Sequence, residues 1–196
     1  MRARFSVNPL AAAGLFLIFA VLPPARAAAV LLATLTHEAA HVYAGFLFGA
    51  RVKKITLMPF GISISMSAPR SYFEEIFVAA AGPAMNFSIC AVILCGKLTA
   101  PCGDLFLFSL TFGALNLLPI RSLDGGAIFS AILSLFVSRD AAERVLDLTG
   151  AAVITALWLC GVYIFFYGAE NFTLLAFSAC MFVYAVMKNG KKQNNT

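Results

Sequence analysis

Charged residues are scarce in this sequence, and histidine is almost absent. Charged side chains make up 12% of the 196 residues, whereas hydrophobic side chains make up 61%. Soluble domains carry about twice that share of charge, so the composition excludes an ordinary soluble domain and favours a membrane protein. Histidine occurs only twice, at His37 and His41. Any histidine chemistry must therefore come from this one place.

Cysteine pairs with metal-binding spacing are also missing. The five cysteines form no C-x-x-C pair, which argues against a soft thiolate metal site. The net charge of +5 gives no reason to invoke nucleic acid, because the positions of the lysines and arginines follow from membrane topology. Internal repeats and low-complexity linkers are absent as well. We therefore expect one membrane-embedded domain over residues 1–187, a short basic cytoplasmic tail over 188–196, and no C-terminal regulatory domain.

Six apolar stretches are candidates for membrane-crossing helices, which need about 20 mostly apolar residues. The fourth is broken around Asn116 to Ser122, and only Gly168 to Asn171 separate the last two, which predicts an antiparallel helical hairpin. The fold class expected is an all-α polytopic membrane protein with about six transmembrane helices and a discontinuous fourth segment. The expected spans are residues 9–22, 27–50, 76–98, 105–137 with its break, 151–167 and 172–187.

Orientation in the membrane follows from the basic residues, which are enriched in cytoplasmic loops. With a cytoplasmic N-terminus, only Arg26 and Lys97 of the 14 lysines and arginines fall on the outer side. We therefore expect a multi-pass membrane protein with both termini in the cytoplasm. One alternative stays open: Arg2, Arg4 and the apolar run up to residues 25–27 resemble a cleavable signal peptide. Cleavage would leave the orientation of the other spans unchanged.

A small β-hairpin is expected after the second helix. Residues 62–67 alternate between apolar and polar side chains, residues 59–61 supply turn chemistry, and residues 55–58 supply a partner strand. Backbone in sheet form cannot face lipid, so this hairpin must lie at the interface or line a protein cavity. Two interpretations remain: an edge that pairs with an extended peptide, or a plain connecting hairpin.

The two histidines lie four residues apart in Thr36-His37-Glu38-Ala39-Ala40-His41. On an α-helix, residues four positions apart project from one face, so both imidazoles can bind one metal ion. Glu38 lies between them, where a carboxylate can take a proton from water activated by the metal. Polar residues deep in a membrane segment are costly and usually functional. We therefore interpret this stretch as a catalytic metal motif rather than a chance pattern.

The third ligand is expected from the broken fourth span. Pro119 should end the helix that arrives there, and Asp124 starts the next one, where it could serve merely as a helix cap. Of the nine acidic residues, however, only Glu38 and Asp124 lie within apolar stretches. We therefore predict one Zn²⁺ per chain, held by His37, His41 and Asp124 with an open position for water, and Glu38 as the unbound catalytic base.

These residues form three motifs that together resemble a known family. They are His37-Glu38-Ala39-Ala40-His41, Gly82-Pro83-Ala84-Met85-Asn86, and Asn116-Leu117-Leu118-Pro119 leading to Leu123-Asp124-Gly125-Gly126. In this order they resemble the site-2 proteases, the intramembrane zinc metalloproteases of peptidase family M50. The resemblance is strongest to members that activate a sigma factor precursor during sporulation, because Leu57-Met58-Pro59-Phe60-Gly61 also matches. Ser122 stands where the family often has a second proline.

The resemblance implies a function and a set of roles. It implies a catalytic core made of the second, third and fourth helices, with zinc reached from the cytoplasmic side. Glu38 takes the cleavage role, His37, His41 and Asp124 the ligand roles, and Asn86 and Asn116 would hold or orient substrate. The partners implied are a membrane-associated protein substrate, the lipid bilayer and an inhibitory membrane partner. The expected reaction is hydrolysis of a substrate peptide bond near the cytoplasmic face.

Two other functions were weighed against proteolysis. A membrane metal transporter or zinc sensor could use the same ligands without hydrolysis, but it should carry more acids or histidines along a path. The sequence has no such residues beyond the one cluster. An inactive membrane chaperone could keep the same fold, but the intact Glu38 argues against it.

Overall fold

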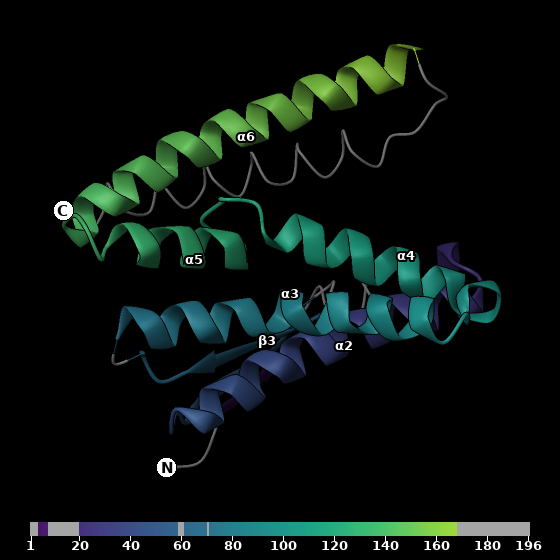
Figure 1. The fold of residues 1–196 in the computed structure, drawn as a ribbon, viewed down its shortest axis with the longest axis horizontal. Coiled ribbons are helices and arrows are strands. Elements are labelled where there is room, and N and C mark those ends of the chain that lie inside the picture. The colour runs from purple at the N-terminus through teal and green to yellow at the C-terminus, as the bar shows by residue number, and fades with distance from the viewer. Residues whose placement is uncertain (1–3, 8–19, 59–60, 70, 168–196) are drawn as a thin grey trace. The chain divides into compact units, whose positions relative to one another are not determined.

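The computed structural model describes residues 4–7, 20–58, 61–69 and 71–167 (Figure 1). The predicted sixth span at 172–187, the tail at 188–196, residues 59–60 of the predicted turn and most of the first span at 9–22 lie outside these residues. The chain divides into two compact units, Met1–Leu117 and Leu118–Thr196.

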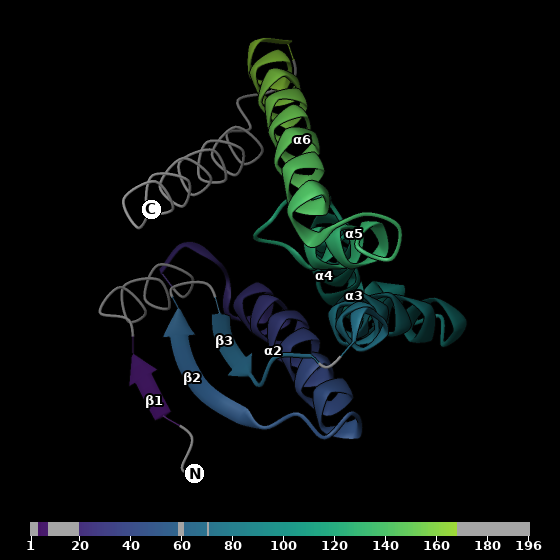
Figure 2. The ribbon, with the colours of Figure 1, turned by 90° about the vertical axis from the view of Figure 1, so that its left-hand side faces the viewer.

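The described residues of the first unit form three helices and a small sheet. Its helices α2, α3 and α4 pack against one another, and strand β3 packs beside α2 (Figures 1 and 2). The elements are β1 (Arg4–Val7), α2 (Pro24–Leu47), β2 (Val52–Met58), β3 (Gly61–Met66), α3 (Tyr72–Cys95) and α4 (Thr99–Asn116).

Helix α2 carries the histidine motif and has clear end signals. Pro24 occupies its first helical position, where the missing N–H costs nothing. At the other end Gly49 has a φ of 75°, the left-handed conformation that commonly terminates helices. Gly45 lets the sheet approach, because an added Cβ would lie 2.6 Å from the Met66 sulfur at the end of β3.

Helix α3 begins before its predicted start at residue 76. The Ser71 hydroxyl caps it by accepting a hydrogen bond from the Glu74 N–H at 3.2 Å. Glu74 and Glu75 lie in its first turn, where negative charge is favoured, so the helix includes two acids ahead of the predicted span. Pro83 lies inside the helix and removes one backbone donor.

The sheet has the order β1-β2-β3 (Figure 2). Strands β2 and β3 pair antiparallel, with Met58 opposite Gly61, at the positions where the alternating pattern predicted a hairpin. Strand β1 pairs parallel to β2, with Arg4 opposite Lys54, and was not predicted. Four residues are too few to show an alternating pattern. The described chain is thus mostly helical with a three-stranded sheet, rather than all-α with one hairpin.

The break in the fourth span is present. Helix α4 ends at Asn116, and α5 (Asp124–Leu133) begins after a turn over residues 117–123. Helix α4 begins at Thr99, before the predicted start at 105, and bends at Cys102, whose φ and ψ are −116° and 19°. Helix α5 ends at Leu133 rather than near 137.

The second unit contains α5 packed on α6 (Arg139–Tyr167). The fifth span, predicted at 151–167, is only the later part of α6. Its first turns are charged and lie ahead of the predicted span. In fact Glu143 and Asp147 lie one helical turn apart and both bind Arg121.

Arg121 anchors the turn before Asp124 to α6. Its guanidinium donates to Asp147 Oδ1 at 2.7 Å and Oδ2 at 2.8 Å, and to Glu143 Oε2 at 3.1 Å. The hydrogen bond to Asp147 is the main cause that raises the pKa of Arg121, which keeps it charged. Two glycines let the turn pack closely: a Cβ on Gly126 would collide with the Ile120 carbonyl, and one on Gly150 would lie 3.2 Å from the Pro119 oxygen.

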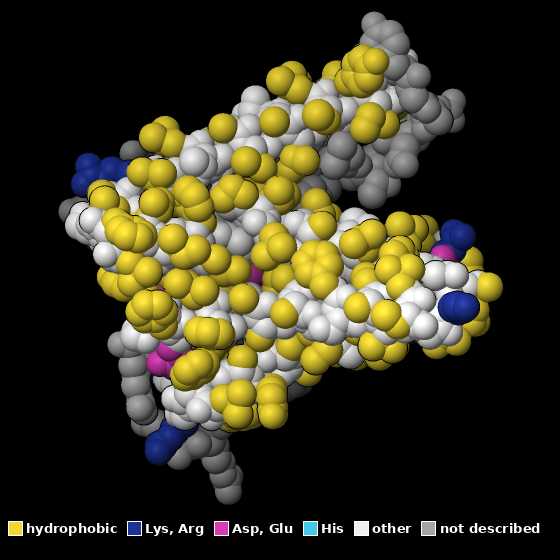
Figure 3. Space-filling model, in the orientation of Figure 1, with side chains coloured by type: hydrophobic (Ala, Val, Ile, Leu, Met, Phe, Trp, Pro, Cys, Tyr) yellow, Lys and Arg dark blue, Asp and Glu magenta, His cyan; other side chains and the backbone are white. Residues whose placement is uncertain are grey.

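The described surface is rich in large apolar side chains. Phe136 is 79% exposed, Leu148 74% and Phe73 62%. Hydrophobic side chains spread over the visible face in Figure 3. Such surfaces are unusual for soluble monomers. Two described helices, α3 and α6 over Arg139–Phe166, are long and apolar enough to cross a membrane, against the six spans predicted for the whole chain.

We expect the Arg121 anchor to be measurable as a coupling energy. Arg121→Met and Asp147→Asn should each lower the melting temperature, with a coupling of about 0.5–1 kcal/mol between them because the pair is bidentate but partly exposed. A double-mutant cycle on thermal unfolding measures it. Arg144→Met is the control. Arg144 is exposed on α6, and it takes no part in the ion pairs of Arg121 and Arg139 with Glu143 and Asp147. Strictly additive effects of the two substitutions would contradict the anchor.

Candidate metal centre

The two histidines face one another across one turn of α2. His37 is 2% exposed and His41 is half-buried. Their Nε2 atoms are 3.1 Å apart, and their ring centroids 4.7 Å. Two nitrogens bound tetrahedrally to zinc at about 2.0–2.1 Å lie about 3.3 Å from each other. The Nε2 pair is therefore spaced as two ligands of a single metal ion.

The far side of each imidazole contacts α3. His41 Nδ1 lies 2.7 Å from the Val78 carbonyl oxygen, which can only accept, so Nδ1 carries the proton and donates. His41 Nε2 is then left with its lone pair, as a metal ligand requires. His37 Nδ1 lies 3.3 Å from the side-chain nitrogen of Asn86, which is completely buried. Hydrogen bonds at the second ring nitrogen are typical of metal-binding histidines.

Gly82 leaves room beside the ligand nitrogens. A Cβ at this position would collide with His41 Nε2 and lie 2.6 Å from His37 Nε2. Val78, Gly82 and Asn86 follow one another at four-residue intervals, so they share the face of α3 that meets α2. The space next to both Nε2 atoms is thus kept clear by the absence of a side chain. This cradle fits a bound ion and its water.

Glu38 and Asp124 are the acidic residues of the predicted site. Glu38 is half-buried on α2 between the histidines. Asp124 is the first residue of α5, and the N-cap position belongs to Leu123, with no side-chain capping bond. The interpretation of Asp124 as the helix cap is therefore not supported. Among the described residues, His37, His41 and Asp124 form the group of donors that can hold a metal ion.

The two asparagines of the motifs differ in their surroundings. Asn86 meets His37 from α3, as described above. Asn116 is the last residue of α4 and half-buried, and its side-chain nitrogen donates to the Phe112 carbonyl one turn earlier at 3.0 Å. This bond stays within its own helix. A substrate role for Asn116 remains a prediction.

Three contributors to the site were not predicted as site residues. Gly82 supplies the cradle, the Val78 carbonyl orients His41, and the Phe112 ring packs edge-on against His37 with centroids 4.9 Å apart. Gly82 could have been found, because a glycine beside a proline within an apolar span signals close packing. A backbone carbonyl such as that of Val78 has no signature in sequence.

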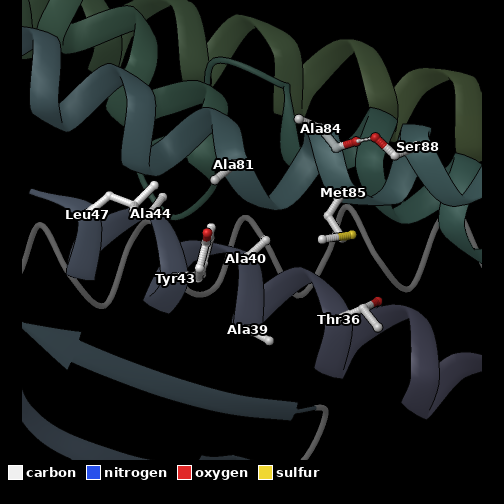
Figure 4. A pocket seen from close by; sticks show the side chains of 10 residues that line it. All are labelled: Thr36, Ala39, Ala40, Tyr43, Ala44, Leu47, Ala81, Ala84, Met85 and Ser88. Atoms are coloured by element: carbon white, nitrogen blue, oxygen red, sulfur yellow. Dashed lines mark hydrogen bonds between the residues drawn. The ribbon is translucent and has the colours of Figure 1, made fainter.

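A groove of about 460 Å³ separates α2 and α3 beside the histidine face (Figure 4). Alanines form half of its lining, and none of the lining residues is a predicted metal ligand. The groove is therefore distinct from the ligand cradle. Its lining is Thr36, Ala39, Ala40, Tyr43, Ala44, Leu47, Ala81, Ala84, Met85 and Ser88.

We expect Gly82→Ala to abolish tight metal binding, because the new methyl group would collide with the ligand nitrogens. Gly103→Ala is the matched control, since a Cβ at that position meets nothing within 4 Å. Zinc binding by each purified variant can be measured by competition with a chromogenic chelator. Equal zinc affinity in the two variants would show that the cradle does not hold the metal.

Comparison with known proteins adds to this geometry. Residues 25–102 match the family model for Peptidase family M50. The chain is 32% identical over 107 residues to a zinc metalloprotease of Methanocaldococcus jannaschii, covering 50% of this chain and 31% of that protein. It is also 32% identical over 111 residues to stage IV sporulation protein FB of Bacillus subtilis, covering 53% and 38% respectively. The chain thus spans about a third of the length of these curated relatives.

The fold is similar to that of a site-2 protease from Methanocaldococcus jannaschii. The TM-score is 0.69 at 22% identity, and the match covers 92% of this chain and 88% of that chain. At this identity the likeness concerns the fold alone. The matched segment contains His37, Glu38 and His41 together with Gly82 and Asn86. In its matched segment the chain is similar to peptidase family M50, and in its fold it is similar to a site-2 protease.

Proposed function

We propose that this protein is an intramembrane zinc endopeptidase that hydrolyses a peptide bond of a membrane-associated protein near the cytoplasmic face. The observation that carries the proposal is the pair of imidazoles with Nε2 atoms 3.1 Å apart and Glu38 between them on one helix. The match of residues 25–102 to a peptidase family and the likeness to a zinc metalloprotease support this reaction class.

The chemistry follows from the donor set. One zinc ion would be held by His37, His41 and Asp124, two imidazoles and a carboxylate of the kind found in catalytic zinc sites. Zinc held there supplies Lewis acidity, which polarises water and the scissile carbonyl. Glu38 accepts a proton from the attacking water and passes it to the leaving amine. The protein forms no covalent bond to substrate in this scheme.

The membrane setting follows from the helix that carries the site. His37 lies on the order of 15 Å along α2 from Leu47, at about 1.5 Å per residue. With the basic loops on the cytoplasmic side, the site opens within the bilayer toward the cytoplasm. We therefore propose a multi-pass protein of the bacterial cell membrane, with both termini cytoplasmic. Its partners are a membrane-associated substrate, the bilayer and an inhibitory membrane partner.

Substrate must reach the site in an extended form, since a helical peptide bond is shielded by its neighbours. Strand β3 ends the sheet order on the side of α2. An edge strand offers backbone donors and acceptors to an added strand. We propose that β3 pairs with the unwound substrate and that Asn116 helps orient it. The likeness to stage IV sporulation protein FB supports a role in sporulation. We propose a sigma factor precursor as the substrate.

We expect Glu38→Gln to keep the metal and lose the reaction. The amide cannot accept a proton, so cleavage should fall by about 10²-fold or more, whereas the ligands are unchanged. The measurement is co-expression with candidate membrane-tethered precursors, together with the zinc content of each purified protein. Full processing by the variant would end the proposal. Metal flux in proteoliposomes that survives the loss of Glu38 would instead favour a transporter.

The ligand role of Asp124 can be tested against a matched position. Asp124→Asn should weaken zinc binding strongly, because a neutral amide replaces a carboxylate ligand. Asp140→Asn is the control, since Asp140 also lies in the first turn of its helix, α6, and is no predicted ligand. Chelator competition compares the two. If zinc affinity falls equally in both variants, Asp124 is not a zinc ligand and acts only as an acidic residue at a helix start.

A further inference from the structure

We propose that Asn86 is a positioning residue for His37. Its side-chain oxygen accepts the Nδ1–H of His37 and thereby leaves Nε2 to the metal. The inference rests on the proposed zinc centre and deepens it. In this assignment the buried Asn86 amide orients the metal ligand His37. The family resemblance had implied that Asn86 holds or orients substrate instead.

Burial makes the state of this amide consequential. Asn86 is completely buried, and His37 and Asn86 are among the largest fully buried side chains of the described chain. The Asn86 side-chain nitrogen lies 3.3 Å from His37 Nδ1. Its Oδ1 atom has no hydrogen-bond partner among the described residues. A buried carbonyl without a donor is costly, so its partner has to be sought in the immediate surroundings.

The metal sets the proton on His37. To give its Nε2 lone pair to an ion, neutral His37 must carry its proton on Nδ1. Two donors, Nδ1–H and the amide NH₂, would then point at each other across 3.3 Å. A half-turn of the amide exchanges its nitrogen and oxygen with almost no change in shape. That rotation brings Oδ1 to the Nδ1–H and gives the orphaned oxygen its donor.

His41 provides an internal reference for this argument. Its Nδ1–H already donates to the Val78 carbonyl, so the same tautomer is imposed there by the backbone of α3. No side-chain substitution at residue 86 removes that acceptor. A change confined to His37 therefore reports on Asn86, and a change in both rings reports on the packing of α2 against α3.

The presence of only two histidines makes the test direct. The full chain, carrying an affinity tag without histidine, is labelled with ¹⁵N-histidine and studied in micelles with zinc bound, because the metal sets the proton on His37. We expect both imidazoles of the wild type in the Nδ1–H tautomer. Asn86→Leu removes the acceptor at similar volume, so the Nδ1–H signal of His37 should shift and exchange faster with solvent, while the Nδ1–H signal of His41 is unchanged. Zinc affinity should fall about 10- to 100-fold.

Two further variants keep the result interpretable. Asn86→Asp retains an acceptor, so the His37 signal and the zinc affinity should return to nearly wild-type values. Ser109→Ala is the control, since Ser109 is also fully buried with an Oγ atom lacking a partner among the described residues. It should leave both histidine signals unchanged. If Asn86→Leu disturbs both rings by unfolding, the Asn86→Asp spectrum alone decides.

An Nε2–H tautomer for His37 in the wild type would overturn the proposal, as would an unchanged His37 signal in Asn86→Leu or its loss in Asn86→Asp. These measurements need neither zinc turnover nor substrate. Failure of the proposed function, such as cleavage by Glu38→Gln, is therefore distinguishable from failure of this assignment.

Discussion

The site depends on the contact between one face of α2 and one face of α3. Two imidazoles four residues apart can turn in many ways, and in this structure their Nε2 atoms lie 3.1 Å apart. That arrangement exists because α3 engages the Nδ1 side of each ring and presents Gly82 between them. The two helices must approach closely for these contacts to form. Buried alanines such as Ala33, Ala40 and Ala79 permit it.

In the second unit, packing and ion pairs fix the turn that precedes helix α5. Pro119 ends the helical path, and the turn that follows is packed against α5 and α6 through Gly126 and Gly150. Arg121 then joins the turn to two carboxylates one helical turn apart. The turn that interrupts the fourth span is thus held in place by close backbone packing and by the guanidinium of Arg121. Asp124 stands at the end of that turn.

Sequence could predict the residues with distinctive chemistry, but not the contacts made by backbone. His37, His41 and Asp124 were identifiable because polar groups in apolar stretches need a reason, and they form the metal-capable group of the described structure. The break after Asn116 was readable from Pro119. The start of α6 was not, because its charged first turns resemble a loop until Arg121 is seen to bind them. Strand β1 and the Val78 carbonyl left no pattern to read.

The two histidines are oriented by unlike means, and this affects how the site can change over generations. His41 is tied to a main-chain oxygen that every amino acid at position 78 would supply equally. His37 meets a side chain, so a single codon at position 86 alters its neighbour. A substitution at position 78 thus keeps the hydrogen-bond acceptor of His41, whereas a substitution at position 86 changes the partner of His37. Position 86 on α3 is therefore one place outside the motif-bearing helix at which a substitution can change metal binding.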